Sequence, residues 1–447
     1  MMAIIILAVA CTLVLVLIKP KWGTFLIWPI LFTYPHGWWY YHAFLPLNMG
    51  VDDLFCIFLF LAVLVRRNLA GGVRPRLGYA FWTITAFTLI AIVANIAGSA
   101  DVPSGLRIGY LKDIMKICVF WGLFYAIINC IDDPRDLKLQ FTMFSLAAVV
   151  GGVLVILQYF YPYRMEIFAA PAVLEIVGAT YGQRTSGAFM NANTAAGALG
   201  CSIMLLITAL RLQQDILRKI TVYGLIFILF LAVAVTRSRS GLIAICSTLV
   251  LMSFLGSGRK VAWFVIVAGL LAGLFFAQAR QLYLERIQDV YDPTTGVYGR
   301  NVQGRFETWS SYLETAATKD YLLGQGFRQG IEKNKMESHS TYVSLLTVYG
   351  IGGLIWGVVS LGLFFKKALF VKRLGAPLLS TVGEGCIWAF INWAIYAGAS
   401  DALSSTYGRY ILFYLVVLAD RASYFAAQQY PEPAGEFVQD QALGMVY

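Results

Sequence analysis

The chain is a succession of apolar stretches, most of them long enough to cross a lipid bilayer as a helix. A membrane-spanning helix needs about 17–25 predominantly apolar residues, and two short stretches near the N-terminus leave the expected count at about 12–13 spans. We therefore predict an all-α fold, that of a polytopic integral membrane protein. The candidate spans are roughly 2–18, 22–34, 51–65, 78–98, 110–130, 140–162, 188–210, 220–236, 240–256, 261–278, 341–364, 381–398 and 408–426.

The composition supports a membrane protein. Of the 447 residues 59% are hydrophobic and only 13% are charged, and the mean hydropathy is +0.71. A soluble domain could not cover that much apolar surface. The formal net charge of +10 would suggest a nucleic-acid partner in a soluble protein. In a membrane protein basic cytoplasmic loops account for it, so no nucleic-acid partner is expected.

The sequence predicts one large domain. We expect a single membrane domain over residues 1–428, with a long external loop at 279–340 and a cytoplasmic, disordered tail at 429–447. The first apolar stretch has neither a basic segment before it nor a small-residue cleavage site after it, so we expect a retained span rather than a signal peptide. The seven cysteines show no paired spacing, which favours buried apolar packing over disulfides or metal ligands.

Basic residues fall on alternate turns and so orient the chain. By the positive-inside rule, the side of the membrane that carries these turns is cytoplasmic. The remaining loops, at 35–50, 99–109, 163–187, 236–241, 279–340 and 399–407, then face outward. The basic turns contain Arg66, Arg67, Arg74 and Arg76; Arg211, Arg218 and Lys219; Arg259 and Lys260; and Lys366, Lys367, Lys372 and Arg373.

Several arginines lie on the outer side, where the same rule disfavours them. Isolated external arginines can contact lipid headgroups. The turn Thr236-Arg-Ser-Arg-Ser-Gly241 is different, because it joins two spans with almost no loop and so holds Arg237 and Arg239 near the membrane surface. Charged groups at this depth are often functional, and guanidinium groups bind phosphate oxygens in pairs. We therefore predict an anion site at this turn.

The long external segment has a helical pattern of its own. Residues 305–316 place Phe306, Trp309, Leu313 and Ala316 at helical spacing, which predicts an amphipathic helix lying on the membrane or over a cavity. A glycine-rich turn follows at 323–330; it lacks the Gly-Lys-Ser/Thr ending of a phosphate loop. His339 then opens the next span, whose first turn Ser338 or Ser340 could cap.

These residues favour a specific chemistry. A histidine is a plausible general base near neutral pH. Arginines on the outer side, where ATP is not generally available, suit a lipid-linked diphosphate donor whose leaving charge they would neutralise. No metal or cofactor is required for this reaction. The one acidic pair on that face, Asp52-Asp53, suits a helix start as well as a metal.

Three ordered stretches resemble a known family. Arg184 to Gly197 is similar to an R-x-x-G-x-F-x-N/H-x-N opening of a span, Thr236 to Leu242 to an S-R-S/G-G turn, and the segment from Gly304 to Tyr342 to a long external loop ending in a histidine. Together they resemble the O-antigen ligase and O-antigen polymerase superfamily of bacterial envelope glycosyltransferases. The similarity is clear over about 180–355 and mainly topological elsewhere.

The resemblance implies an inverting, metal-independent glycosyltransferase in the bacterial inner membrane, acting at the periplasmic face on an undecaprenyl-diphosphate-linked glycan. By motif, Arg184 and Arg239 would bind the diphosphate and His339 would serve as base or orient the acceptor. Arg305 is a supporting cation, and Arg237 lies outside the usual motif position. The remaining predicted substrate-binding residues are Asn191 and Asn193, each of which is read equally well as a helix cap.

Two positions depart from the family pattern. Ser340 follows the histidine where the family usually has asparagine, and Ala192 stands where relatives often have proline in Asn-Pro-Asn. Neither change removes a charge. They leave the orientation of the histidine as an open point.

The acceptor is open between another lipid-linked glycan, for a polymerase, and a lipid A-core sugar, for a ligase. Two other classes compete with this reading. A transporter or flippase would use Lys112, Asp113, Lys116 and Glu384, although the sequence has no internal repeat of the kind many transporters show. A metal-dependent oligosaccharyltransferase would use Asp52 and Asp53.

Overall fold

A computed structural model of the chain describes residues 14–33, 50–69, 75–100, 102–161, 173–177, 180–189, 191–256, 260, 263, 266, 291–292, 297–298, 300–315, 318–326, 339–403 and 405–429. These residues are helical almost throughout, which confirms the predicted all-α membrane fold. Two short antiparallel strand pairs, which the sequence did not predict, lie in loops predicted to face outward. They pair Val173 with Arg184 and Tyr291 with Tyr298 at their open ends.

The helices follow one another in chain order. They are α2 (Pro20–Thr33), α4 (Val51–Leu69), α5 (Tyr79–Ala100), α6 (Ser104–Cys130), α7 (Pro134–Phe160), α8 (Ala192–Ala209), α9 (Ile216–Thr236), α10 (Arg239–Leu255), α13 (Arg300–Thr315), α14 (Thr318–Leu323), α16 (Thr341–Thr347), α17 (Gly350–Leu374), α18 (Pro377–Gly398) and α19 (Thr406–Gln429). The 3-10 turns are η2 (Gly187–Phe189) and η3 (Leu210–Leu212), and the strands are β1 (Val173–Val177), β2 (Thr180–Arg184), β3 (Tyr291–Asp292) and β4 (Val297–Tyr298).

Seven of the described helices are long and apolar enough to cross a membrane, namely α5, α7, α8 with η3, α9, α17, α18 and α19. Helices α4 and α6 have 19 and 27 residues but include several charged side chains, and α10 has 17 residues. The predicted spans 2–18 and 261–278 fall largely outside the described residues. The expected total of about 12–13 spans therefore stays a prediction.

The predicted span 341–364 is wrong as a single helix. It divides into α16 and α17, with a break at residues 348–349, and Gly350 there has φ +69°. The loop 324–326 docks at this break, where the backbone N–H groups of Gln325 and Gly326 donate to the carbonyls of Thr347 and Val348 at 3.0 and 3.1 Å. Helical periodicity continues across the break, so the apolar pattern alone does not reveal it.

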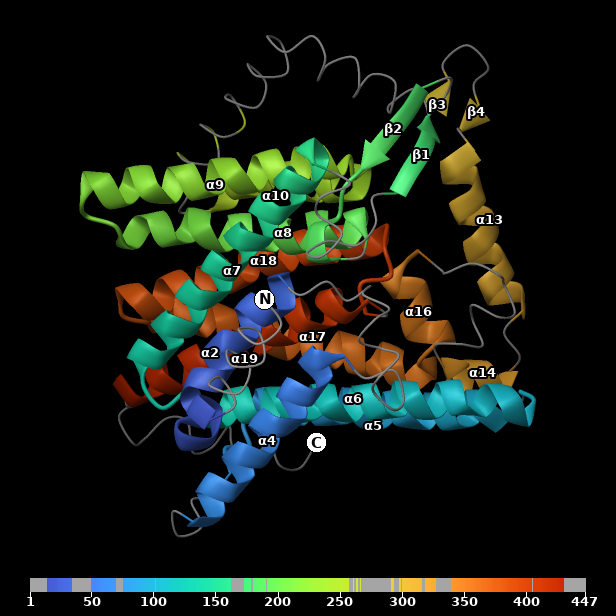
Figure 1. Ribbon diagram of the computed structural model, residues 1–447, viewed down its shortest axis with the longest axis horizontal. Helices are drawn as coiled ribbons and strands as arrows, with labels where there is room; N and C mark the ends of the chain where they lie inside the picture. Colours follow the sequence, from blue (N-terminus) through green and yellow to red (C-terminus); the bar gives the residue numbers. More distant parts are fainter. Residues whose placement is uncertain are drawn as a thin grey trace.

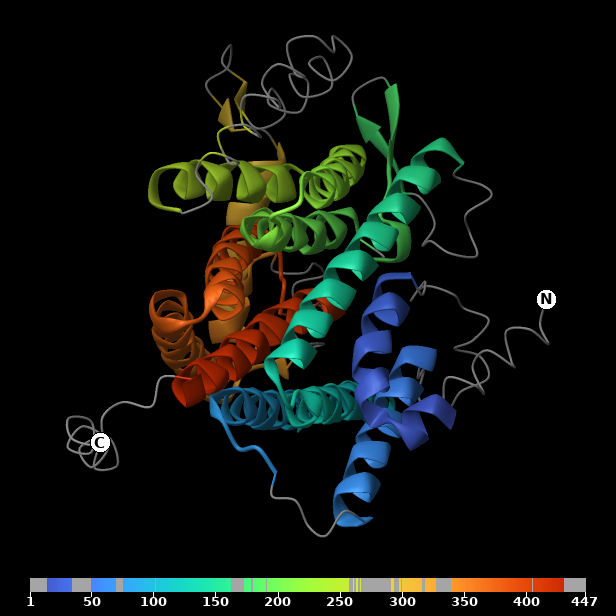
Figure 2. The ribbon, with the colours of Figure 1, turned by 90° about the vertical axis from the view of Figure 1, so that its left-hand side faces the viewer.

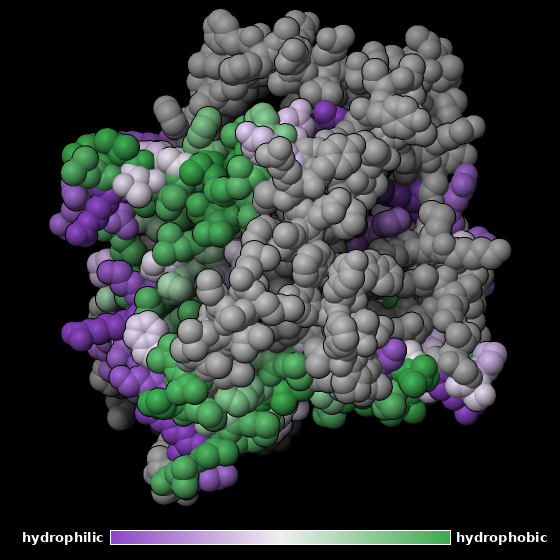
Figure 3. Space-filling view, in the orientation of Figure 1, coloured by the Kyte–Doolittle hydropathy of each residue, from purple (hydrophilic) through white to green (hydrophobic). Residues whose placement is uncertain are grey.

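The long helices lie side by side, and their connections gather at two ends of the bundle. One end, at the left of Figure 1, holds the turns that join α6 to α7, α8 to α9 and α17 to α18, where the predicted cytoplasmic arginines and lysines lie; we call it the basic end. The other end holds β1–β4, α13 and α16, and we call it the loop end. Figure 3 shows hydrophilic side chains at the basic end and broad apolar surface between the ends.

Helices α8 and α19 form the interior of the bundle, and α19 runs between α8 and the α5–α6 pair (Figure 2). Every residue of α8 is buried except Asn193, in its first turn at the loop end. Helices α9 and α17 instead expose apolar side chains such as Phe227 and Val358, as helices facing lipid do. A helix that is apolar on all sides and buried, such as α8, belongs at the centre of a membrane bundle.

Helix α8 packs against α18 at positions where glycine lets the backbones approach. A Cβ on Gly200 would lie 2.7 Å from the Nδ2 of Asn392, and one on Gly385 would lie 2.7 Å from the Oγ1 of Thr208. Close packing at small residues is a main source of helix association in membranes, because lipid is as apolar as the helices themselves.

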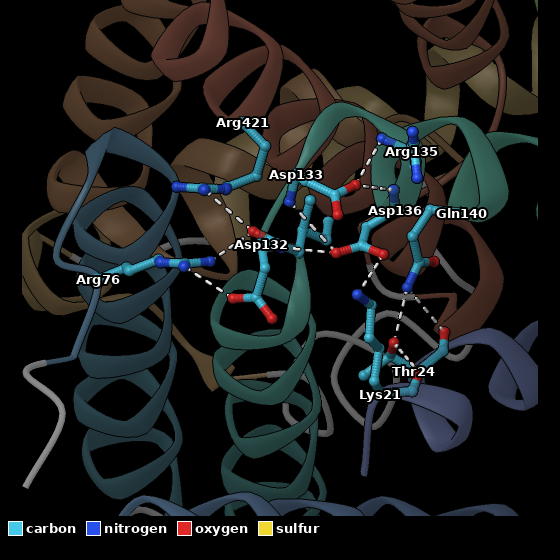
Figure 4. A network of polar contacts seen from close by, with 10 residues as sticks. Lys21, Thr24, Arg76, Asp132, Asp133, Arg135, Asp136, Gln140 and Arg421 are labelled. Atoms are coloured by element: carbon cyan, nitrogen blue, oxygen red, sulfur yellow. Dashed lines mark hydrogen bonds and ion pairs between the residues drawn. The ribbon is translucent and has the colours of Figure 1, made fainter. Parts of the chain in front are cut away.

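Polar contacts at the basic end tie α2, α5, α7 and α19 together (Figure 4). The carboxylates of Asp133 and Asp136 form a capping box at the start of α7, and the Lys21 ammonium pairs with Asp136. Across the same turn, Arg76 pairs with Asp132 at 2.7 Å, and the Nη2 of Arg421 donates to the carbonyl of Ile131 at 3.0 Å. The basic end thus contains its own counter-charges.

Glu384 is a wholly buried carboxylate in α18, and it too is paired at the basic end. The Arg211 guanidinium contacts one of its oxygens, the Lys372 ammonium lies 3.9 Å from the other, and the indole N–H of Trp388 donates to it at 3.3 Å. A buried carboxylate is stable only when it is paired in this way.

We predict that Arg211→Ala lowers the stability of the protein. The change removes a guanidinium that contacts the buried Glu384 carboxylate. We expect the free energy of unfolding to fall by about 1–3 kcal/mol, less than the roughly 3–5 kcal/mol of a fully buried pair, because Arg211 is partly exposed. Thermal unfolding of the purified protein in detergent, followed by tryptophan fluorescence, measures the shift.

Arg218→Ala is the matched control, since Arg218 lies near the same turn and its side chain is 76% exposed, 4.0 Å from Asp215. Its midpoint should match that of the unsubstituted protein. Equal shifts for the two variants would show that the buried ion pair is not what stabilises this end.

Candidate functional site

Helix α8 begins at the loop end with two asparagines of different roles. The Oδ1 of Asn191 accepts the backbone N–H of Asn193 at 2.8 Å, so Asn191 caps the helix. Asn193 lies in the first turn of the helix, half-buried, and its Oδ1 accepts the hydroxyl of Ser238 at 2.8 Å. Of the two predicted substrate-binding residues, Asn191 has a local capping contact, and Asn193 joins α8 to a second element.

That second element is the two-arginine turn. Helix α9 ends at Thr236, Arg237 is its C-cap, and Ser238 caps α10 by accepting the backbone N–H of Gly241 at 3.2 Å. Arg239 is the first residue of α10 and is half-buried, as is Arg237. Helix caps therefore hold the turn at both ends, and they fix the backbone positions from which the side chains of Arg237 and Arg239 extend.

Gly241 brings the starts of α8 and α10 together. A Cβ at this position would lie 2.2 Å from the Cβ of Ala196 in α8, closer than any real contact allows. Two adjacent helix N-termini therefore point toward the loop end, next to Arg237 and Arg239. Helix N-termini carry partial positive charge and free N–H groups, so the pair favours an anion.

The polar loop before α8 runs along the same region. Thr185 donates from its hydroxyl to the carbonyl of Val235 at 3.1 Å, just before the end of α9. The backbone N–H groups of Ser186 and Gly187 both donate to the Oε1 of Gln158 at 2.9 Å, and Gly187 has φ +55°. Arg184 ends β2 directly before these contacts, so its backbone is placed beside the end of α9. Its side chain lies outside the described structure.

The phenylalanine of the same motif anchors this loop in the core. The Phe189 ring packs edge-on against Phe32, with centroids 5.3 Å apart, and against Tyr407 at 4.9 Å. The hydroxyl of Tyr407 lies 2.9 Å from the carbonyl of Ala188 and 2.7 Å from that of Leu31. The motif thus places a rigid turn between Arg184 and Asn191.

The histidine lies at the same end of the bundle on different elements. His339 is half-buried and is followed by Ser340, which is in the N-cap position of α16 but makes no side-chain capping bond there. Ser340 thus has the predicted N-cap position but not the capping hydrogen bond. The other predicted cap, Ser338, lies outside the described residues. Thr341 holds the helix start, since its hydroxyl donates to the carbonyl of Ser400 at 3.1 Å and accepts the N–H of Ala402 at 2.8 Å.

Asp401 is a candidate that sequence reasoning missed. Its Oδ2 accepts the hydroxyl of Ser344 at 2.5 Å, which ties the α18–α19 loop to α16 just after His339. The signal in the sequence was weak, because Asp401 is a single carboxylate in a short loop predicted to face outward. Only the fold brings this loop next to α16.

Arg237 and His339 share an uncommon backbone conformation. Among the described non-glycine residues they are the two with positive φ, at +53° and +51°. A left-handed conformation costs roughly 1–2 kcal/mol for a residue with a Cβ. Such strain is found preferentially at functional sites, where the surrounding structure holds it in place. Both residues belong to the set predicted from the sequence.

Helix α13 covers part of the loop end, lying across the direction of the long helices (Figure 1). It packs beside α16 and buries Thr308 and Tyr312. Phe306 and Leu313 are 56% and 42% exposed, so that face is available to lipid or glycan. Arg305 is half-buried on this helix.

The acidic pair near the start of α4 has a structural partner. Asp52 and Asp53 are both buried, and the Oδ2 of Asp53 accepts the backbone N–H of Gly50 at 2.9 Å. This is the helix-start role that its position favours. Within the described residues no three histidine, cysteine, aspartate or glutamate side chains gather as metal ligands would.

The structure therefore joins most of the predicted residues at one end. Asn193 and the Arg237–Arg239 turn are in direct contact through Ser238, and Arg184 leads into the loop beside them. His339 and Arg305 lie at the same end, on α16's start and on α13. An arrangement of arginines, helix N-termini and an imidazole can bind an oxyanion and accept a proton.

Comparison with known proteins bears on this region. A family model described as O-Antigen ligase matches residues 224–356. The match includes the arginine turn, α10, α13, His339 and α16, whereas Arg184, Asn191 and Asn193 precede it. No curated protein matches the chain. The match confirms, over residues 224–356, the resemblance to the O-antigen ligase superfamily that the sequence motifs predicted.

Proposed function

We propose that the protein transfers or polymerises glycan from an undecaprenyl-diphosphate-linked donor at the periplasmic face of the bacterial inner membrane. The observation that carries the proposal is the hydrogen bond from Ser238 to Asn193, which places the arginine turn against the N-terminus of α8. The starts of α8 and α10 and the two-arginine turn thereby lie together, which supports a diphosphate site.

The orientation follows from charge. The turns at the basic end carry the arginines and lysines that the positive-inside rule assigns to the cytoplasm, so the loop end faces the periplasm. Residues 1–428 would form one membrane domain, with 279–340 as the periplasmic loop and 429–447 as a cytoplasmic tail. A lipid-linked donor reaches the loop end by diffusion in the outer leaflet.

The reaction we propose is a single displacement. An acceptor hydroxyl oxygen bonds to the anomeric carbon as the bond from that carbon to the diphosphate oxygen breaks, and undecaprenyl diphosphate leaves. Attack from the side opposite the leaving group inverts the anomeric centre. His339 takes the hydroxyl proton, and Arg239, Arg237 and Arg184 neutralise the diphosphate.

The remaining residues have supporting roles in this scheme. Asn193 orients the turn through Ser238, Asn191 holds the start of α8, and Arg305 adds a cation from α13. The arginines supply the positive charge that a divalent cation supplies in other transferases, so the proposed reaction is metal-independent. The acceptor is a second lipid-linked glycan in a polymerase, or a lipid A-core sugar in a ligase.

The function is tested by reconstituting the protein with a lipid-linked repeat unit. Longer glycans formed without added acceptor would identify a polymerase, and products formed only with lipid A-core would identify a ligase. We expect one of these outcomes, unchanged in excess chelator. Movement of the lipid-linked unit across the bilayer with no new glycosidic bond would show a transporter, and loss of transfer in chelator would favour a metal-dependent enzyme using Asp52 and Asp53.

We predict that Arg239→Ala lowers the transfer rate by about 10²–10³, because one preorganised contact to the leaving diphosphate is lost. Arg239→Lys should also be impaired, since an ammonium cannot bind two phosphate oxygens in the paired geometry of a guanidinium. The rate of product formation from the donor measures both. Arg218→Lys, at the basic end, is the control, and near-normal transfer by Arg239→Lys would contradict paired binding.

We also predict that His339→Ala abolishes transfer while the protein still inserts and folds. Loss of a general base typically costs about 10²–10⁴ in rate. Transfer to acceptors of increasing hydroxyl acidity should recover part of the rate, because a more acidic hydroxyl needs the base less. Full activity of His339→Ala would assign the proton transfer to another group.

A further inference from the structure

The last turn of α18 carries a buried tyrosine between the two parts of the candidate site. Tyr396 is 1% exposed, and its ring lies against the backbone of α8 at Gly197. A Cβ on Gly197 would lie 2.7 Å from two ring carbons of Tyr396, so only glycine permits this contact. Gly197 is the last residue of the stretch that begins at Arg184.

The Tyr396 hydroxyl contacts side chains rather than the backbone carbonyls that tyrosines in helix bundles often use. The Ser400 hydroxyl donates to it at 2.8 Å, and the side chain of Thr194 lies near it on the α8 side. Thr194 belongs to α8, and Ser400 to the loop between α18 and α19. One phenolic oxygen therefore links two separate elements.

Each of these partners leads to one part of the site. Thr194 follows Asn193, whose side chain accepts from Ser238 in the arginine turn. The carbonyl of Ser400 accepts the hydroxyl of Thr341, two residues after His339. A continuous path of short contacts thus runs from the arginine turn through Tyr396 to the start of α16.

We propose that Tyr396 is a positioning residue, which sets the arginine turn and the histidine in register with each other. This rests on the proposed glycan transfer, and it adds a residue from outside the motifs and outside the family match at 224–356. Both ends of the path carry a residue with positive φ, Arg237 and His339, and such conformations persist only where neighbouring contacts hold them.

The physical reason is geometric. The proton must move to the imidazole as the diphosphate leaves, so the base and the cations must stand at a fixed separation. A misplacement of about 1 Å can lower a rate by about 10²-fold, even when every reacting group is present. Tyr396 fixes that separation because it is buried, its ring lies against α8 at Gly197, and its hydroxyl is bonded to Ser400.

The test is Tyr396→Phe, which keeps the ring against Gly197 and removes only the hydroxyl. We expect kcat for glycan transfer to fall by about 10–100-fold, while the KM for the lipid-linked donor changes less than about threefold, because the diphosphate-binding cations remain. A purely structural role would instead lower the amount of folded enzyme and leave kcat per folded molecule unchanged. Thermal unfolding in detergent measures the folded fraction.

Tyr79→Phe is the matched control. The Tyr79 hydroxyl donates to the carbonyl of Ser360 at 2.6 Å, between α5 and α17 and away from the path, so its loss should leave kcat unchanged. Thr194→Val removes the hydroxyl on the α8 side and should lower kcat as much as Tyr396→Phe does. Thr194→Ser keeps a hydroxyl at this position and should have the kcat of the unsubstituted protein. The double variant Tyr396→Phe with Thr194→Val should lose no more than the worse single variant.

The outcomes separate the two claims. Unchanged kcat in Tyr396→Phe, or fully additive losses in the double variant, would overturn the positioning role while leaving glycan transfer in place. If neither the unsubstituted protein nor the Tyr79→Phe variant transfers glycan, the proposed function is overturned, and with it the role of Tyr396 in that reaction.

Discussion

The contact between α8 and α18 is the interaction on which the rest of the structure depends. At Gly197, Gly200 and Gly385 the two helices approach so closely that a Cβ would overlap the partner side chain. In lipid, helices gain nothing from hydrophobic exclusion of water, so packing of this kind holds the bundle together. Because α8 and α18 meet in one register only, the loop-end residues Asn193, Thr194 and Tyr396 come to lie beside one another.

The two ends of the bundle use charge differently. At the basic end carboxylates form ion pairs with the cations. Asp136 pairs with Lys21, as Figure 4 shows, and Glu384 pairs with Arg211. At the loop end the arginine turn contacts the neutral amide of Asn193 and lies beside two helix N-termini. Helix N-termini favour anions, which is why we propose the chemistry there.

Much of the architecture followed from periodicity and charge. The bounds of α5, α9, α10 and α19 lie within a few residues of the predicted spans, because a bilayer requires one apolar helix after another. The break between α16 and α17 could not be predicted, since the docked loop at Gly324–Gly326 comes from elsewhere in the chain.

The sequence by itself determined the class of protein and predicted the residue types of the proposed site. Apolar length, the distribution of basic turns and the motifs from Arg184 to His339 carry that information locally. Only the tertiary structure decided which residues meet. Ser238 contacts Asn193 and Ser344 contacts Asp401, and each pair is 45 or more residues apart in the chain. Tyr396 contacts Ser400 and lies near Thr194 of another helix. Such contacts depend on how whole helices pack, and no local pattern encodes that packing.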